Sequence, residues 1–182
     1  MTTTARRTIA AGAVTLLGGA ALWMAALSPA QAAAPTCRGY TATIVGTSGS
    51  DEINGTSGRD VIVALGGHDE IDGNGGNDII CAGAGNDEVD GGSGNDWIDG
   101  GSGHDDLEGS SGNDSIKGGS GNDHVEGESG RDKVYGDSGR DLVEGGTAKD
   151  TVSGGSGADL VKQKYATERQ EDRWEDQNRY DD

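Results

Sequence analysis

Phenylalanine is absent from this sequence of 182 residues, and aromatic residues of all kinds make up only 4% of it. Apolar residues account for 31%, which is too little for a conventional close-packed core. The chain has only 14 basic residues against 32 acidic ones, so its net charge is −18. A chain this acidic repels nucleic acid and anionic lipid and attracts cations, so we expect no nucleic-acid partner.

Motifs of the common enzyme classes are also missing. The sequence has no His-Glu-x-x-His zinc motif, no Gly-x-Ser-x-Gly nucleophile turn and no phosphate loop ending in Gly-Lys-Ser/Thr. The histidines His68, His104 and His124 do not have the spacing of zinc ligands, and we interpret them as solvated surface residues. We therefore expect no catalytic residues and no enzymatic activity.

Long hydrophobic runs are lacking except near the N-terminus. Arg6 and Arg7 precede an apolar run from Ile9 to Leu27, and the small-residue motif Ala30-Gln31-Ala32 follows it. This order is typical of a cleavable export signal, here over residues 1–32, and the alternative is a membrane anchor. We expect a secreted, extracellular product that does not insert into the membrane after cleavage, exported by the general secretory or the twin-arginine route.

What the sequence has in abundance is glycine, with 35 residues, arranged in a strict repeat. From Gly46 to Lys162 it divides into thirteen consecutive nonapeptides without an insertion, such as GGSGNDWID and GGSGHDDLE. The sixth position is Asp and the eighth is Ile, Val or Leu in every unit, and the fourth is Gly except at Ala148. Glycine-rich turns alternating with short half-buried strands predict an all-β solenoid of stacked repeats over residues 46–162.

The nonapeptides resemble the G-G-x-G-x-D-x-U-x repeats of the hemolysin-type, or RTX, calcium-binding family. The resemblance implies a right-handed parallel β-roll with two repeats per coil. It also implies calcium between each turn and the turn two repeats later, held by Asp carboxylates and backbone carbonyls. The implied ligands are Asp51, Asp60, Asp69, Asp78, Asp87, Asp96, Asp105, Asp114, Asp123, Asp132, Asp141, Asp150 and Asp159. Stacking the thirteen turns in two columns gives up to about eleven intervening Ca²⁺ sites.

The residue chemistry agrees with this expectation, because calcium is a hard ion that takes six to eight oxygen ligands. One aliphatic side chain per repeat buries too little surface to offset the entropy of ordering the chain, so we expect folding to depend on calcium. The main hypothesis is a secreted calcium-binding protein that folds on binding the ion. The alternative is an extracellular structural or adhesive protein, in which calcium only stiffens the roll and one face binds a cell surface or polymer.

The two sheets of such a roll would present unequal outer faces. The odd repeats place acidic residues outward, whereas the even repeats begin with Val61, Val63, Ile79, Cys81 and Trp97. An apolar patch of this kind calls for a cover.

The segment at residues 33–45 has the composition of a cap strand, and we expect it to lie over this patch. Its Cys37 would then form a disulfide with Cys81, and two free thiols are the alternative. Residues 163–182 form a charged C-terminal tail or cap.

Overall fold

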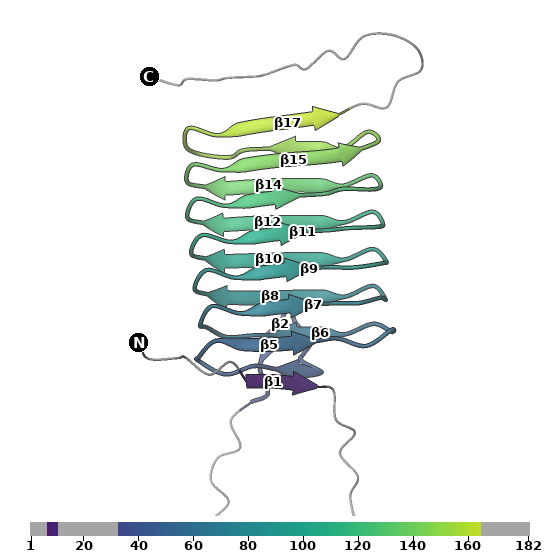
Figure 1. Ribbon diagram of the computed structural model, residues 1–182, viewed down its shortest axis with the longest axis vertical. Coiled ribbons are helices and arrows are strands. Elements are labelled where there is room, and N and C mark those ends of the chain that lie inside the picture. The colour runs from purple at the N-terminus through teal and green to yellow at the C-terminus, as the bar shows by residue number, and fades with distance from the viewer. Residues whose placement is uncertain (1–6, 11–32, 165–182) are drawn as a thin grey trace, which may run out of the picture.

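The protein folds into a solenoid of two facing parallel sheets, as seen in a computed structural model that describes residues 7–10 and 33–164 (Figure 1). The first sheet contains, in spatial order, β1 (Arg7–Ala10), β5 (Asp51–Asn54), β7 (Glu70–Asp72), β9 (Glu88–Asp90), β11 (Asp106–Glu108), β13 (His124–Glu126), β15 (Leu142–Thr147) and β17 (Leu160–Lys164). The second contains β4 (Ile44–Val45), β6 (Val61–Val63), β8 (Ile79–Ala84), β10 (Trp97–Ser102), β12 (Ser115–Ser120), β14 (Lys133–Ser138) and β16 (Thr151–Ser153). Odd repeats build the first sheet and even repeats the second, so the predicted all-β roll is confirmed.

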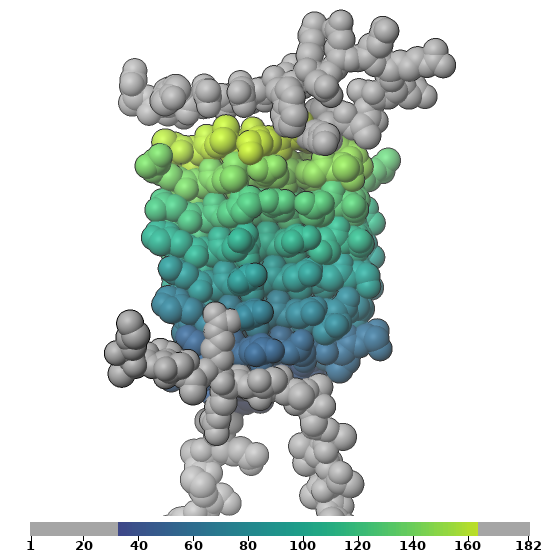
Figure 2. All heavy atoms as spheres, in the orientation of Figure 1, coloured from purple at the N-terminus to yellow at the C-terminus, as the bar shows by residue number. Residues whose placement is uncertain are grey.

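The register of the strands shows that one coil contains two nonapeptides. Ile62 pairs with Ile80, and Ile80 pairs with Ile98, each a step of eighteen residues. Figure 2 shows the result as layers of colour that follow the chain and stack along the long axis. Several strands of the second sheet are longer than the three residues that the repeat predicts, because pairing continues into the first positions of the next unit, as in β10 (Trp97–Ser102).

The core between the sheets is thin, because most repeats contribute only one side chain to it. The eighth residue of each repeat points into it, and the side chains from Ile53 to Val143 at this position are at most 2% exposed. Val152 and Val161, in the last two coils, are only partly buried. A core this thin is continuous along the roll but leaves little depth for hydrophobic stabilisation.

The N-terminal end of the repeat region has an additional strand. Strand β1 pairs in parallel with β5, with Arg7 opposite Asp51, although it lies inside the predicted export signal. Cleavage after residue 32 would leave β5 as the edge strand of its sheet. The rest of the predicted signal and the predicted tail from residue 165 onward lie outside the described residues. No helix in the described part of the chain is long and apolar enough to cross a membrane.

A small hairpin from residues 33–45 packs on the apolar patch of the second sheet. Strands β2 (Thr36–Cys37) and β3 (Tyr40–Thr41) form a small antiparallel hairpin. Cys37 packs with Val61, Val63 and Ile79 in a second apolar cluster and is bonded to Cys81.

Two arginines make cation–π contacts between this cover and the roll. Arg38 lies over the ring of Trp97, with its guanidinium carbon 5.3 Å from the ring centroid, and Arg59 lies 4.7 Å from that of Tyr40. Ile44 and Val45 depart from the expectation of a cap, because they form β4 and extend the second sheet below the first even repeat.

Candidate metal centre in the stacked turns

The thirteen turn aspartates lie in two columns, one along each edge of the roll. In all but the last aspartate of each column, the backbone N–H donates a hydrogen bond to the Oδ1 of the Asp eighteen residues later. Asp87 N lies 3.0 Å from Asp105 Oδ1, and the same contact recurs from Asp51 to Asp159 in one column and from Asp60 to Asp150 in the other. The repeat therefore brings together every pair of turns that the sequence analysis expected to share an ion.

The second oxygen of these carboxylates is buried and lacks a hydrogen-bond partner in most repeats. The unpartnered Oδ2 atoms belong to Asp69, Asp78, Asp87, Asp96, Asp105, Asp114, Asp123, Asp132, Asp141 and Asp150. A buried carboxylate oxygen without a partner is costly, and native proteins rarely tolerate a series of them without an ion. The orphaned oxygens thus define a regular row of anionic positions.

Glycine occupies the first position of every repeat except the third and fifth, which have Ala64 and Ala82, and it allows carbonyl oxygens to approach the carboxylate. A Cβ added to Gly100 would lie 2.6 Å from Asp105 Oδ2 and 2.6 Å from the carbonyl oxygen of Gly118 in the next coil. Only a residue without a side chain leaves that space open. The donor set is therefore composed of carboxylate and carbonyl oxygens, which fits Ca²⁺ and not a metal that prefers nitrogen or sulfur.

Glycine at the fourth position has a different role, which is close contact between coils. Gly112 has a φ of 151°, and a Cβ there would lie 1.4 Å from the carbonyl oxygen of Gly94. The turn thus needs both a left-handed backbone and the absence of a side chain. Ala148, the one exception to glycine at this position, has a φ of 107°. The nearby Gly130 N to Thr147 O distance is 3.4 Å, against 2.8 Å for Gly112 N to Ser129 O.

Burial raises the pKa values of the ten turn carboxylates from Asp69 to Asp150. The pKa of Asp114 rises from an ordinary value of 3.8 to about 7, mainly by desolvation and also through the charges of Asp96 and Asp132. The pKa of Asp105 rises to about 6 for the same reasons, with Asp87 and Asp123 as its neighbours. The hydrogen bond from the backbone opposes the shift without cancelling it. Bound cations would supply the positive charge that these stacked carboxylates lack.

The first turn in each column is built differently, which the sequence analysis missed. Asp51 Oδ2 accepts hydrogen bonds from Thr47 N at 2.6 Å and Thr47 Oγ1 at 2.9 Å. Asp60 Oδ2 accepts from Thr56 N at 2.7 Å and Thr56 Oγ1 at 2.8 Å. These two carboxylates are satisfied by the protein alone. Threonine occupies the second position only in the first two repeats, and this is the sequence feature that marks the two turns whose aspartate is hydrogen-bonded by the protein alone.

His68 and His104 occupy the fifth position of their turns. They are exposed, and each Nδ1 accepts a backbone hydrogen bond of 2.8 Å, from Asn86 N and Asn122 N respectively. Neither contributes to the row of buried oxygens. His124 lies instead on the outer face of the first sheet.

The disulfide prediction is confirmed by the contact of Cys37 with Cys81, whose Cα atoms are 5.9 Å apart. The described residues contain no free cysteine.

A sequence profile of the RTX calcium-binding nonapeptide repeat (4 copies) matches this chain at residues 45–80, 73–107, 99–134, 108–143 and 127–161. The matches together span the roll, and the chain belongs to this family of calcium-binding proteins. No curated protein matches the chain at a significant level.

Proposed function

We propose that the chain is an exported calcium-binding protein whose roll folds when calcium binds between its turns, and that it has no catalytic activity. The series of buried, unpartnered Oδ2 atoms from Asp69 to Asp150 carries this proposal. Without a cation, the folded state confines like charges in two columns over a thin core. In the unfolded chain, water solvates those charges, so the apo protein gains little by folding. Calcium, which binds the folded turns, therefore shifts the equilibrium towards the folded state.

The position of the strongest sites follows from the same atoms. Each proposed site lies between one turn aspartate and the aspartate eighteen residues later. Where the first of the two is Asp69, Asp78 or a later residue, its Oδ2 has no hydrogen-bond partner. Where the first is Asp51 or Asp60, a threonine already donates hydrogen bonds to that Oδ2. The proposed ions therefore concentrate in the third and later repeats. Thr47 and Thr56 close the N-terminal end of both columns without metal.

Equilibrium dialysis with calcium tests the assignment of the ligands. Asp105→Asn keeps the shape of the side chain and removes its charge, so it should reduce the number or affinity of bound ions. Asp106→Asn is the matched control, because Asp106 is the next residue and is exposed on the outer face of β11. Equal losses in both variants, or none in either, would contradict the proposal.

Export rests on the order of charged, apolar and small residues over 1–32. Mass spectrometry of the protein from the producing cell's medium should find an N-terminus just after Ala32. A cell-bound product that retains residues 1–32 would contradict export with cleavage.

A structural or adhesive role is the second candidate, favoured by the register of acidic side chains on the first sheet. Glu52, Glu70, Glu88 and Asp106 stand in one row, and Asp72, Asp90, Glu108, Glu126 and Glu144 stand in another. Adjacent like charges are unfavourable, and a cationic surface or polymer would relieve them.

Binding of the calcium-loaded protein to the producing cell's envelope tests this role. Glu88→Gln with Asp90→Asn should weaken binding, whereas Asp99→Asn with Asp137→Asn, on the second sheet, should not. Equal binding by both variants would refute a role for the acidic face.

A further inference from the structure

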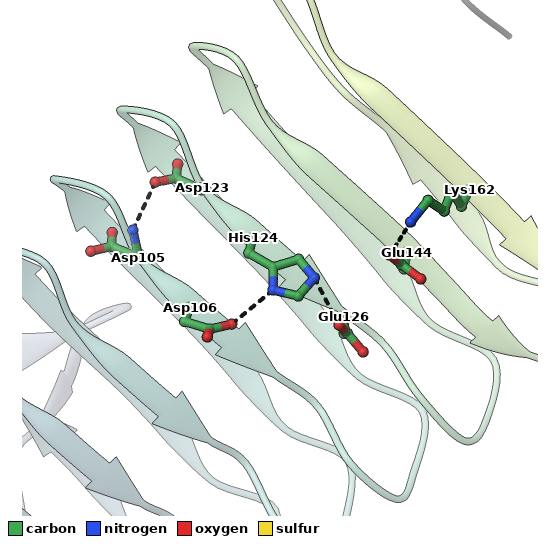
Figure 3. A network of polar contacts seen from close by, with 7 residues as sticks. All are labelled: Asp105, Asp106, Asp123, His124, Glu126, Glu144 and Lys162. Atoms are coloured by element: carbon green, nitrogen blue, oxygen red, sulfur yellow. Dashed lines mark hydrogen bonds and ion pairs between the residues drawn. The ribbon is translucent and has the colours of Figure 1, made fainter. Parts of the chain in front are cut away.

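His124 breaks the acidic pattern on the outer face of the first sheet, and its ring is held in a fixed orientation. Its Nδ1 lies 3.1 Å from Asp106 Oδ1 on the preceding strand β11. A carboxylate at this distance accepts the Nδ1–H, which leaves the lone pair of the neutral ring on Nε2. Figure 3 shows the ring between Asp106 and Glu126, with Nε2 on the side away from Asp106.

The Nε2 atom is buried and has no hydrogen-bond partner among the described residues. It lies 2.7 Å from Glu126 Oε1, two residues further along β13, but without the geometry of a hydrogen bond. In the neutral tautomer, both of these atoms present lone pairs to each other. The arrangement is unfavourable unless a proton on Nε2 or a metal cation lies between them.

A third ligand atom comes from the next strand. Glu144 on β15 is the cross-strand partner of Glu126, and the ligand atoms of His124, Glu126 and Glu144 all lie within 4.8 Å of one another. The three side chains are half-buried, so a bound ion would be partly shielded from water. Within the described residues this is the one such group that includes a histidine.

We propose that His124, Glu126 and Glu144 form a site for a divalent transition metal of the zinc class, separate from the calcium sites in the turns. Zinc accepts both imidazole nitrogen and carboxylate oxygen as ligands, and three protein ligands leave a fourth position for water. Calcium prefers an all-oxygen environment, so the imidazole favours zinc at this position. Asp106 is a positioning residue, which orients the ring through Nδ1.

The ammonium group of Lys162 would compete with a metal ion for Glu144. Its Nζ lies 2.8 Å from Glu144 Oε1, on the neighbouring strand β17 (Figure 3). Zinc binding would require Glu144 to offer its other oxygen or to exchange the ammonium group for the metal. The ion pair therefore lowers affinity for the metal, and removing it should raise that affinity.

Isothermal titration of zinc into protein saturated with calcium tests the proposal. Calcium occupies the turns, and circular dichroism verifies separately that the roll is folded, so failure of calcium-driven folding and failure of this site are distinguishable. The wild-type protein should bind one zinc equivalent tightly, and His124→Ala should lose it. Asp106→Asn should weaken it about tenfold or more, and Lys162→Met should tighten it.

The matched control is His104→Asn, because Asn is the residue at the same turn position in neighbouring repeats, such as Asn95 and Asn113. This variant should keep the zinc equivalent in full. Nitrogen NMR of the His124 ring should show Nε2 shifting on addition of zinc, while Nδ1 keeps its proton. Equal zinc binding by wild type and His124→Ala, or an imidazolium ring that zinc does not change, would overturn the proposal and leave an ion-paired histidine.

Discussion

Replacing Gly112 with alanine should destabilise the roll far more than the same change at Gly49, although both occupy the fourth position of a repeat. At Gly112, φ is 151° and the new Cβ would lie 1.4 Å from the carbonyl oxygen of Gly94. At Gly49, φ lies outside the left-handed region, and the nearest atom is Thr47 Oγ1 at 3.9 Å. The two substitutions are chemically identical and differ only in the local backbone conformation and in what surrounds the methyl group.

The expected magnitude follows from two costs at Gly112. A backbone conformation that alanine rarely adopts costs about 1–3 kcal/mol. The clash with Gly94 forces adjacent coils apart by more than an ångström, and overpacking of this kind costs about 1–3 kcal/mol. Gly112→Ala should therefore lower the free energy of unfolding by about 2–6 kcal/mol, and Gly49→Ala by less than about 1 kcal/mol.

Urea unfolding at saturating calcium, followed by far-UV circular dichroism, measures both losses. The calcium midpoint of Gly112→Ala should also move to higher concentration, because the shifted carbonyl belongs to the turn that faces the ion. Equal losses at Gly112 and Gly49 would refute the account of close contact between coils.

The C-terminal coil should bind calcium more weakly than the centre, so Asp150→Ala should reduce calcium affinity less than Asp105→Ala in a titration; equal losses would contradict the ranking. In the calcium-free protein, burial raises the pKa of Asp114 to about 7 from an ordinary 3.8, so the folded state binds more protons than the unfolded chain between these values. The stability of the apo roll should therefore be greatest below pH about 4 and fall as the pH rises towards about 7, while calcium affinity should change in the opposite direction; an apo β signal in circular dichroism that grows with pH would refute this. The Cys37–Cys81 bond closes a loop across a sequence separation of 44, for which chain entropy suggests about 4 kcal/mol. Its reduction should therefore increase hydrogen exchange in the first coils and leave exchange in the central coils unchanged, and uniform loosening of the roll would contradict a local role.

The sequence alone predicts most of the roll because two positions of the nonapeptide, the sixth and the eighth, have the same residue type in all thirteen units. The phase of the aspartates and aliphatic residues determines which side chains face inward and which turns stack. An apolar patch beside Cys81 on one sheet is enough to place the cover and to pair this residue with Cys37.

The details that the sequence did not predict depend on backbone angles and on neighbours in adjacent coils. Thr47 and Thr56 follow the repeat in position but do not adopt the positive φ seen at Leu65 and Asn74, which hold the same place in the next two units. Their amides and hydroxyls turn to the carboxylate instead. From the sequence alone, His124 is indistinguishable from an ordinary surface residue. Its proposed role becomes visible only from the strand register, which places Asp106 and Glu144 on the strands beside β13.

Far-UV circular dichroism of the mature protein, titrated with calcium from excess chelator, tests the central claim most directly. The orphaned carboxylate oxygens and the thin core predict a coil spectrum in chelator at neutral pH. Addition of calcium should produce a cooperative change to a β spectrum, at the micromolar to millimolar concentrations at which protein calcium sites typically bind. Magnesium at the same concentration should not produce it, because it demands near-ideal octahedral geometry and sheds water reluctantly. A β spectrum that is already complete in chelator and unchanged by calcium would contradict the account.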